Sequence, residues 1–430
     1  MIAAEPKTTG QYQAYPEYKD SGVEWLGNIP AGWHVNKLKY LASLVTKKAS
    51  NRIYPIGLEN IESWTGRFLP SDSEFQGEGI EFVNGDILFG KLRPYLAKVM
   101  LAGSVGEAVG DFHVIRPEDD VVSRYLQYQL LTKEFISVVD GSTFGAKMPR
   151  VSWEFMADLV CAQPSKDEAI SIATFLDYET ARIDQLITLQ QRLIELLKEK
   201  RQAVISHAVR TRPSEGHIKL AYAINLLTGY PFASSGFKST KDTHIPLLRG
   251  ANVGVDQIKW DDVVYWDSED CSHLDDYYLE CGDIVFGMDR PWISSGARVA
   301  EITQHDTPCL LLQRVARIRA KANHFQTYIK LCLSSNEFRN YVEADLTGVS
   351  VPHISPDQIK GFLIRNLPYD EQVSVTKEVL QALEKLNAVE KAAFNAIELL
   401  QERRTALISA AVTGKIDLRY WTRPAEEAAA

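Results

Sequence analysis

The sequence predicts an α+β protein with an internal pseudo-twofold duplication: two globular domains and a pair of long antiparallel coiled-coil helices. A 43-residue segment that starts at Asp167 recurs without a gap at Asp370, 203 positions later. The two copies end in similar text, ELLKEKRQAVISHAV and ELLQERRTALISAAV. The text before each copy mixes short strand-like runs with short helical runs. The repeated unit is therefore a globular domain followed by a long helix.

Each repeated segment has the pattern of a helix that packs along another helix. Apolar residues recur in steps of three and four, with one position skipped. The seam is Leu-rich in the first copy and Ala-rich in the second, which favours packing between the two copies. Ser165 with Glu168 predicts a capping box, and Pro213 and Gly414 predict the two helix ends. The predicted seam residues are Ile183, Leu186, Leu193, Leu197, Leu386, Val389, Leu400 and Leu407.

The rest of the chain is divided around these helices. The same elements recur in the same order in both copies. The run NKLKYLASLVT in the first copy is similar to HIKLAYAINLLT in the second, and NGDILFGKLRP is similar to CGDIVFGMDRP. The predicted segments are a disordered extension (1–17), a first domain (18–165), a central helix (166–212), a second domain (213–366), a C-terminal helix (367–413) and a tail (414–430).

Composition narrows the class of protein. The chain has 430 residues, 45% of them hydrophobic, and no run long enough for a membrane helix. The N-terminus lacks the pattern of a signal peptide, so we expect a cytoplasmic protein. Its five cysteines show no paired spacing and predict buried thiols in a reducing compartment. The net charge of −9 argues against nonspecific coating of nucleic acid, but leaves room for a local basic face.

Motifs for catalysis are missing from the sequence. No phosphate loop, dinucleotide-binding turn or Asn/Asp-Pro-Pro-aromatic tetrapeptide of DNA amino-methyltransferases is found. Cys271 and His273 could form half of a metal site, but no second pair accompanies them, so no metal is expected. A noncatalytic chain is the prediction.

Both domains share a GDI-apolar-FG run followed by Arg-Pro, which gives Arg93 and Arg290. One interpretation is a fold element whose arginine pairs with a neighbouring carboxylate. The other is a guanidinium presented to phosphate or to a guanine edge. The GSTFGAKMPRVS loop adds further basic residues, and loops on a rigid body suit base reading. The predicted DNA contacts are Lys91, Arg93, Lys147 and Arg150 in the first domain, and Arg249, Arg290 and His353 in the second.

Over nearly its full length the chain resembles the specificity (S) subunit of type I restriction-modification systems, the HsdS family. The resemblance is carried by YKDSGVEWLGNIPAGWHVNKLKYL, by the two GDI-apolar-FG elements and by FLDYETARIDQLI from Phe175. The second helix departs from this text and reads VLQALEKLNAVE from Val379, which puts partner contacts at that end in doubt.

The resemblance implies two target recognition domains, each reading one half of a bipartite, asymmetric DNA sequence, with the helices setting the spacing. It implies partners as well: two modification subunits that carry S-adenosylmethionine for adenine N6 methylation, and restriction subunits that use ATP and Mg. Two alternatives stay open, a coiled-coil scaffold that binds protein partners with its two lobes, and a self-contained methyltransferase or nuclease, which the missing motifs disfavour.

Overall fold

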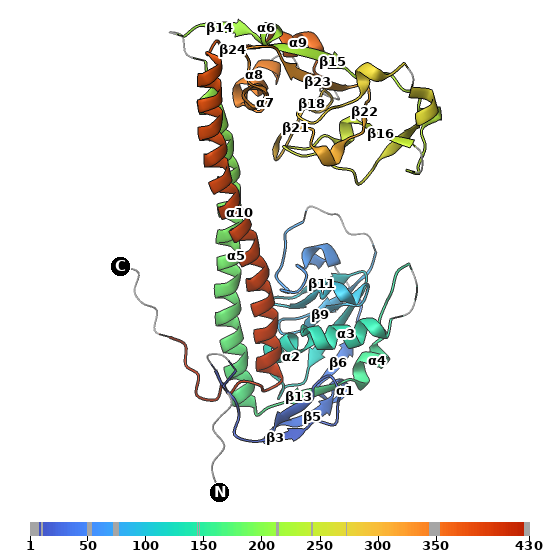
Figure 1. The fold of residues 1–430 in the computed structure, drawn as a ribbon. Helices are drawn as coiled ribbons and strands as arrows, with labels where there is room; N and C mark the ends of the chain where they lie inside the picture. The colour runs from blue at the N-terminus through green and yellow to red at the C-terminus, as the bar shows by residue number, and fades with distance from the viewer. Residues whose placement is uncertain are drawn as a thin grey trace. The chain divides into compact units, whose positions relative to one another are not determined.

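The chain folds into two compact units, seen here in a computed structural model (Figure 1). Unit 1 is Met1–Leu189 with Ala396–Ala430, and unit 2 is Gln190–Asn395. The structure describes residues 8–9, 12–49, 54–71, 77–143, 145, 147–211, 215–241, 244–271, 273–343 and 353–424. Because the boundary between the units cuts both long helices, the segment boundaries taken from the sequence stay predictions.

The two long helices are α5 (Lys166–Val209) and α10 (Tyr369–Val412), each of 44 residues (Figure 1). At the start of α5 the Ser165 Oγ accepts a hydrogen bond from the Glu168 amide at 3.4 Å, which is half of the predicted capping box. The Glu168 carboxylate instead accepts a 2.6 Å bond from the Tyr15 hydroxyl. Gly414, with φ of +69°, follows the end of α10, whereas Pro213 lies outside the described residues.

Within each unit α5 and α10 run antiparallel, and two of the eight predicted seam residues lie outside the buried face. Ile183 and Leu407 are buried, whereas Leu186 and Val389 are 46% and 45% exposed. Ile187, one residue further on, packs into the core of unit 1. The reason is that steps of three and four can alternate in either order from Ile183, and both orders meet apolar residues. The half-buried seam residues are Leu193, Leu197, Leu386 and Leu400.

The globular part of unit 1 is built on a four-stranded antiparallel sheet with the order β10-β9-β12-β6. A three-stranded sheet, β7-β11-β8, and the pairs β5-β13 and β3-β4 accompany it. The strands are β3 (Tyr18–Asp20), β4 (Asn28–Pro30), β5 (His34–Lys37), β6 (Ala42–Val45), β7 (Pro55–Ile56), β8 (Gly79–Phe82), β9 (Ile87–Gly90), β10 (Val99–Leu101), β11 (Gly106–Val109), β12 (Phe112–Pro117) and β13 (Val160–Gln163). The helices are α1 (Leu38–Leu41), α2 (Ser123–Leu130), α3 (Lys133–Gly141) and α4 (Trp153–Asp158), with 3-10 turns η1 (Leu58–Asn60) and η2 (Pro94–Leu96).

Unit 2 repeats this arrangement, because its main sheet has the matching order β21-β18-β23-β15. The pair β14-β24 recurs as well. The second sheet, β17-β16-β22, keeps the parallel strand pair of unit 1, but its third strand is added beside β16 and not beside β22. The strands are β14 (His217–Lys219), β15 (Ile224–Thr228), β16 (His244–Leu248), β17 (Val264–Asp267), β18 (Ile284–Gly287), β19 (Trp292–Ile293), β20 (Gly296–Ala297), β21 (Val299–Glu301), β22 (Leu310–Leu311), β23 (Val315–Ala320) and β24 (Leu363–Arg365). The helices are α6 (Leu220–Ala223), α7 (Gln326–Leu333), α8 (Asn336–Glu343) and α9 (Pro356–Gly361), with 3-10 turns η3 (Ser234–Gly236), η4 (Gly250–Asn252), η5 (Ser268–Cys271), η6 (Asp275–Tyr277) and η7 (Gln304–Asp306). The predicted α+β duplication is confirmed.

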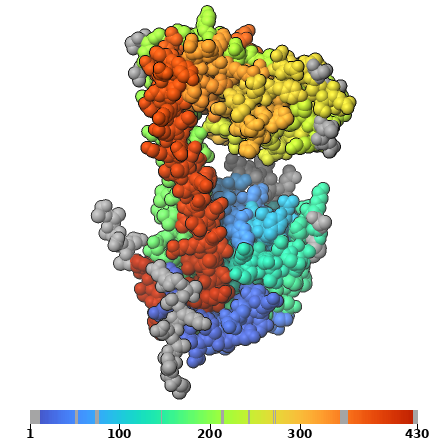
Figure 2. All heavy atoms as spheres, viewed as in Figure 1, coloured from blue at the N-terminus to red at the C-terminus, as the bar shows by residue number. Residues whose placement is uncertain are grey.

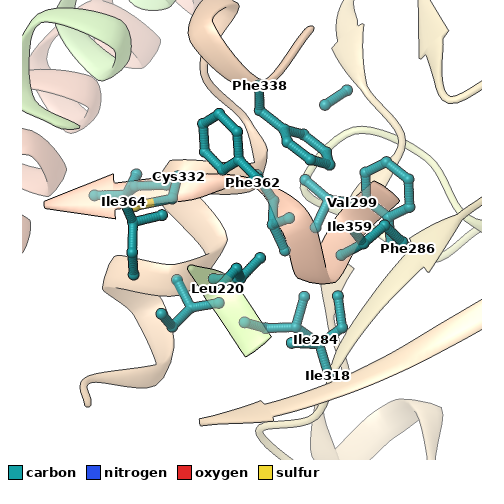
Figure 3. Close-up of a cluster of buried hydrophobic side chains, with 14 of the residues drawn as sticks. Leu220, Ile284, Phe286, Val299, Ile318, Cys332, Phe338, Ile359, Phe362 and Ile364 are labelled. Carbon is teal, nitrogen blue, oxygen red and sulfur yellow. The ribbon is translucent and has the colours of Figure 1, made fainter. Parts of the chain in front are cut away.

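The core of unit 2 shows why the apolar triplet after Gly-Asp forms a central strand (Figure 3). β18 lies between β21 and β23, and all four of its residues are buried. Ile284 and Phe286 point into the same cluster as Phe338 and Phe362, because alternate residues of a strand share a face. The Phe338 and Phe362 rings meet edge to face at 4.9 Å.

Described segments near both ends of the chain pack in unit 1, which corrects the expectation that the N-terminal extension is disordered. In the extension expected to be disordered, β1 (Thr8–Thr9) pairs with β2 (Tyr12–Gln13) in an antiparallel ladder, and Tyr15 is 6% exposed. In the tail, Ile416 and Leu418 are 1% exposed in the same core as Trp33. The Asp417 amide also donates to the Gln13 carbonyl at 2.8 Å. Apolar side chains in both terminal segments therefore complete this core. On the surface of unit 1, red C-terminal residues meet the blue N-terminal part of the chain (Figure 2).

Candidate nucleic-acid interface

The Gly-Asp turn before β9 and β18 has a structural role in both units. Asp86 is 1% exposed and receives Nε and Nη2 of Arg116 at 2.8 and 2.7 Å. In unit 2, Asp283 is 3% exposed and receives the same two nitrogens of Arg319. Each buried carboxylate is therefore satisfied by an arginine from the neighbouring strand. The carboxylate of this motif is consequently already paired and does not hold Arg93 or Arg290.

Arg93 and Arg290 share an unusual backbone conformation at the end of this motif. Their φ angles are +51° and +45°, in the left-handed region that side chains other than glycine rarely adopt. Both residues are exposed, and within the described part of the chain no hydrogen bond or ion pair reaches either guanidinium. The Arg93 amide donates to the Pro149 carbonyl at 2.8 Å, so the following loop holds the turn in place. The fold thus fixes two equivalent arginines whose guanidinium groups are exposed and have no polar partner among the described residues.

Three of the four residues predicted for the first domain meet around Asp111. The Lys91 amide donates to the Asp111 carbonyl at 2.9 Å, and Leu92, beside Arg93, bridges to Arg150. The Arg150 guanidinium bonds both carboxylate oxygens of Asp111, which lowers the pKa of Asp111 although burial opposes this shift. Lys147 is exposed in the same loop, without a polar contact to this group among the described residues. Unit 1 therefore presents a basic loop cluster around the Arg93 turn.

Unit 2 builds the corresponding place with different residues. His353 Nδ1 lies 2.6 Å from Asp289 Oδ1, and Arg314 Nη1 lies 3.0 Å from Asp289 Oδ2. Burial would raise the pKa of Asp289, but Arg314 and His353 outweigh it and lower the pKa. The part of the predicted loop at 348–352 lies outside the described residues. His353 and Arg290 are brought together, because Asp289 pairs with His353 immediately before Arg290.

Arg249, the third residue predicted for the second domain, has another contact. Its Nη2 donates to the Asp262 carbonyl at 2.7 Å and pairs with the Asp262 carboxylate at 2.8 Å. The side chain is 24% exposed. Arg249 is therefore held by a neighbouring loop, and its contact with DNA stays a prediction.

Asp111, Asp289 and Arg314 were missed from the sequence. Asp111 and Arg314 stand 203 positions apart, as do Arg150 and His353, so the duplication pairs them. At the equivalent positions unit 1 has Asp111 and Arg150, whereas unit 2 has Arg314 and His353. The carboxylate in unit 2 comes from Asp289 instead. Alignment of the two copies pairs Asp111 with Arg314, but only the fold shows which polar groups meet. The same frame therefore carries different polar groups in the two units.

Two further findings bear on the class of protein. None of the described helices is long and apolar enough to cross a membrane. Across the described ranges, no group of three or more His, Cys, Asp or Glu side chains is placed to hold a metal ion. Cys271 and His273 lie outside any such group.

Comparison with known proteins gives relatives of one kind. The chain is 36% identical over 179 residues to the type I restriction enzyme EcoAI specificity subunit of Escherichia coli, a match that spans 41% of this chain and 30% of that protein. It is 24% identical over 312 residues to the MjaVIII specificity subunit of Methanocaldococcus jannaschii, across 69% of this chain and 70% of that protein. The first of these relatives is thus matched over less than a third of its length. No family model matches the chain.

Solved structures share the fold. A chain from a study of complex assembly and conformational transition of the type I R-M system matches 89% of this chain and 98% of its own length, with a TM-score of 0.72 and 15% identity. The HsdS subunit from Thermoanaerobacter tengcongensis matches 90% of this chain, with a TM-score of 0.54 and 16% identity. The curated relatives described above are type I restriction enzyme specificity subunits, and the chain shares the fold of a solved HsdS subunit, so both comparisons support an assignment to the HsdS family.

Proposed function

We propose that this chain is the noncatalytic DNA sequence-recognition subunit of a type I restriction-modification enzyme in the cytoplasm. Each globular domain reads one half of a bipartite, asymmetric target. The observation that carries this proposal is the duplicated arginine turn, with the exposed guanidinium groups of Arg93 and Arg290 at equivalent points of two similar domains. A guanidinium offers two parallel donors to the O6 and N7 atoms of guanine, or to a phosphate.

The neighbouring residues divide the work of recognition. In the first domain Lys91 and Lys147 contact the phosphate backbone and position the protein. Arg93 and Arg150, whose backbone segments are joined by the bridge between Leu92 and Arg150, read bases. In the second domain Arg290 and His353 read bases, and Arg249, which the neighbouring loop holds, contributes a further DNA contact. Since the polar groups differ between the two units, the two half-sites differ in sequence.

The long helices set the distance between the half-sites and dock the partners. Two modification subunits supply S-adenosylmethionine and methylate adenine at N6, and restriction subunits supply ATP- and Mg-dependent cleavage. Exposed apolar side chains on the helices, Leu186, Leu189 and Leu399 among them, offer contact area for these partners. This chain itself holds no cofactor.

Methylation mapping tests the proposal. DNA from cells that express the chain with its modification subunit is compared with DNA from cells that lack the chain. A new N6-methyladenine signal at one bipartite motif is expected. A stable complex without any new methylated motif would instead favour a scaffold that binds protein with its two lobes, the alternative that the net charge of −9 supports.

A further inference from the structure

The helix seam of each unit contains one arginine at the position where apolar residues are skipped. These arginines are Arg201 in α5 and Arg404 in α10, 203 positions apart. The Arg404 side chain is 9% exposed and the Arg201 side chain is 25% exposed. A guanidinium in an apolar seam is costly unless several partners accept its hydrogen bonds.

In unit 1, Arg404 contacts the other helix and the globular domain at once. Its Nε lies 3.0 Å from Asp184 Oδ1 on α5, and its Nη1 donates to the Trp64 carbonyl at 2.8 Å. Trp64 has a left-handed backbone, with φ of +66°, and lies four residues after the buried Asn60. The Arg404 side chain therefore connects α5 and α10 to the turn at Trp64 in the globular domain.

Unit 2 contains the same three-way contact. Arg201 donates to Asn387 of α10, the equivalent of Asp184, and its Nη2 donates to Asp256 Oδ2 at 2.6 Å. Asp256 again has a left-handed backbone, with φ of +57°, and lies four residues after the buried Asn252. Lys330 of α7 also pairs with Asp256, at 3.0 Å.

The two contacts differ in where the negative charge stands. In unit 1 the carboxylate is Asp184 on the helix, and the domain offers only a backbone carbonyl. In unit 2 the helix offers the amide of Asn387, and the domain offers the carboxylate of Asp256. The geometry has thus been kept while the partner residues changed, which indicates that the connection matters more than any one residue in it.

We propose that Arg404 and Arg201 are positioning residues that lock each recognition domain to the helix pair, so that the enzyme accepts one spacing between its half-sites. The inference rests on the proposed function. A change of one base pair in the spacer moves a half-site by one step of a helix with about ten base pairs per turn, which rotates it by roughly 35°. A rigid connection rejects that rotation, whereas a loosened one tolerates it.

The first experiment measures methylation by the complete modification complex on three duplexes. They carry the mapped half-sites with the cognate spacer, or with one base pair fewer or more. For Arg404→Gln and Arg201→Gln the preference for the cognate spacer is expected to fall by roughly tenfold, within the range of coupling between residues in direct contact. Arg403→Gln and Lys200→Gln, which remove a charge from the neighbouring exposed positions, should keep the preference of the wild type.

A merely structural role gives a different result. If the arginine variants lose thermal stability but methylate all three duplexes more slowly by one common factor, the positioning role is refuted. A rescue adds a second check in unit 2. Asp256→Asn should relax the spacer preference, and adding Asn387→Asp should restore it, because the carboxylate then faces Arg201 from the helix as it does in unit 1.

A measurement without DNA separates this inference from the proposed function. Spin labels are placed as noncanonical residues at two exposed positions of unit 1, Gln185 on α5 and Glu59 beside the Trp64 turn. The distribution of distances between them should broaden in Arg404→Gln and stay narrow in Arg403→Gln. Equal widths in both variants would refute the locking role, even if the enzyme methylates a bipartite target. Broadening without any bipartite target would support the lock and refute the proposed function.

Discussion

Arg150 donates two hydrogen bonds to Asp111, from Nε to Oδ1 at 2.9 Å and from Nη2 to Oδ2 at 2.8 Å. This paired arrangement fixes the plane of the guanidinium and holds the loop that carries Pro149 against the Arg93 amide. The pair therefore positions Arg93 as well as presenting Arg150. Four predictions follow from this site and from the packing around it.

The Asp111 pair makes stability depend on pH. Arg150 lowers the pKa of Asp111 in the folded protein, so the ion pair stabilises the fold above the unfolded value of about 3.9. The stabilisation is lost as the pH falls through the lowered folded value. Asp111→Asn should therefore lower the melting temperature near pH 7, and the difference from wild type should shrink as the pH falls below the unfolded pKa of Asp111 and vanish below its lowered folded pKa. A constant difference from pH 7 to pH 2 in thermal unfolding would contradict this prediction.

Arg93 and Lys147 should affect DNA binding in different ways. Arg93→Ala is expected to cost about 1–3 kcal/mol on the target and to relax the requirement at one base pair. Lys147→Ala should weaken binding to all sequences alike and reduce the dependence on salt. Titration of the complex against matched and single-mismatch duplexes at several salt concentrations measures both effects. Identical mismatch profiles for the two variants would refute the assignment of base reading to Arg93 and of phosphate contact to Lys147.

The tail should contribute to stability although it follows the last helix. Leu418 is 1% exposed, and Leu418→Ala should cost about 2–5 kcal/mol in the free energy of unfolding, through lost burial and a cavity. Tyr420, which is 87% exposed, is the matched control, and Tyr420→Ala should change stability by less than about 0.5 kcal/mol. Denaturant unfolding followed by tryptophan fluorescence reports both. Equal effects would mean that the tail does not pack as described.

The helix seam can be tested in the same way. Ile183 is 3% exposed, so Ile183→Ala should cost about 2–5 kcal/mol. Leu186 is 46% exposed, and Leu186→Ala should cost less than about 0.5 kcal/mol in the isolated chain. In the complex, Leu186→Ala should instead weaken binding of a modification subunit, measured by titration of that subunit. Loss of stability at Leu186 in the isolated chain would restore the seam first predicted.

Much of the fold could be predicted because the sequence contains an internal duplication, so that each pattern is seen in two copies. The repeat identified both helices, and Gly-Asp with an apolar triplet identified the central strands β9 and β18. The seam was placed one residue off at Leu186, since a helical pattern of threes and fours is satisfied equally well by Leu186 or Ile187. The tail was missed because two apolar residues, Ile416 and Leu418, are too few to define a periodic element.

The candidate site could be predicted only in part. Arg93 and Arg290 were found because the motif repeats, and the structure adds that both are held in a left-handed turn. Asp111 and Asp256 were not found, because their partners lie 39 and 55 residues away in the chain and only the fold brings them together. The arginines of the seam appeared in the sequence as a skipped apolar position and nothing more.

Unit 2 is one continuous stretch of chain, whereas unit 1 is assembled from Met1–Leu189 and Ala396–Ala430. During synthesis the ribosome releases the chain from its N-terminus, so unit 2 can close while unit 1 still lacks its last helix segment. Until Arg404 has been synthesised, Asp184 and the Trp64 carbonyl lack their hydrogen-bond donor. Until Leu418 has been synthesised, the core around Trp33 is incomplete. A chain interrupted before residue 396 would therefore contain all of unit 2 but would lack the last helix segment of unit 1.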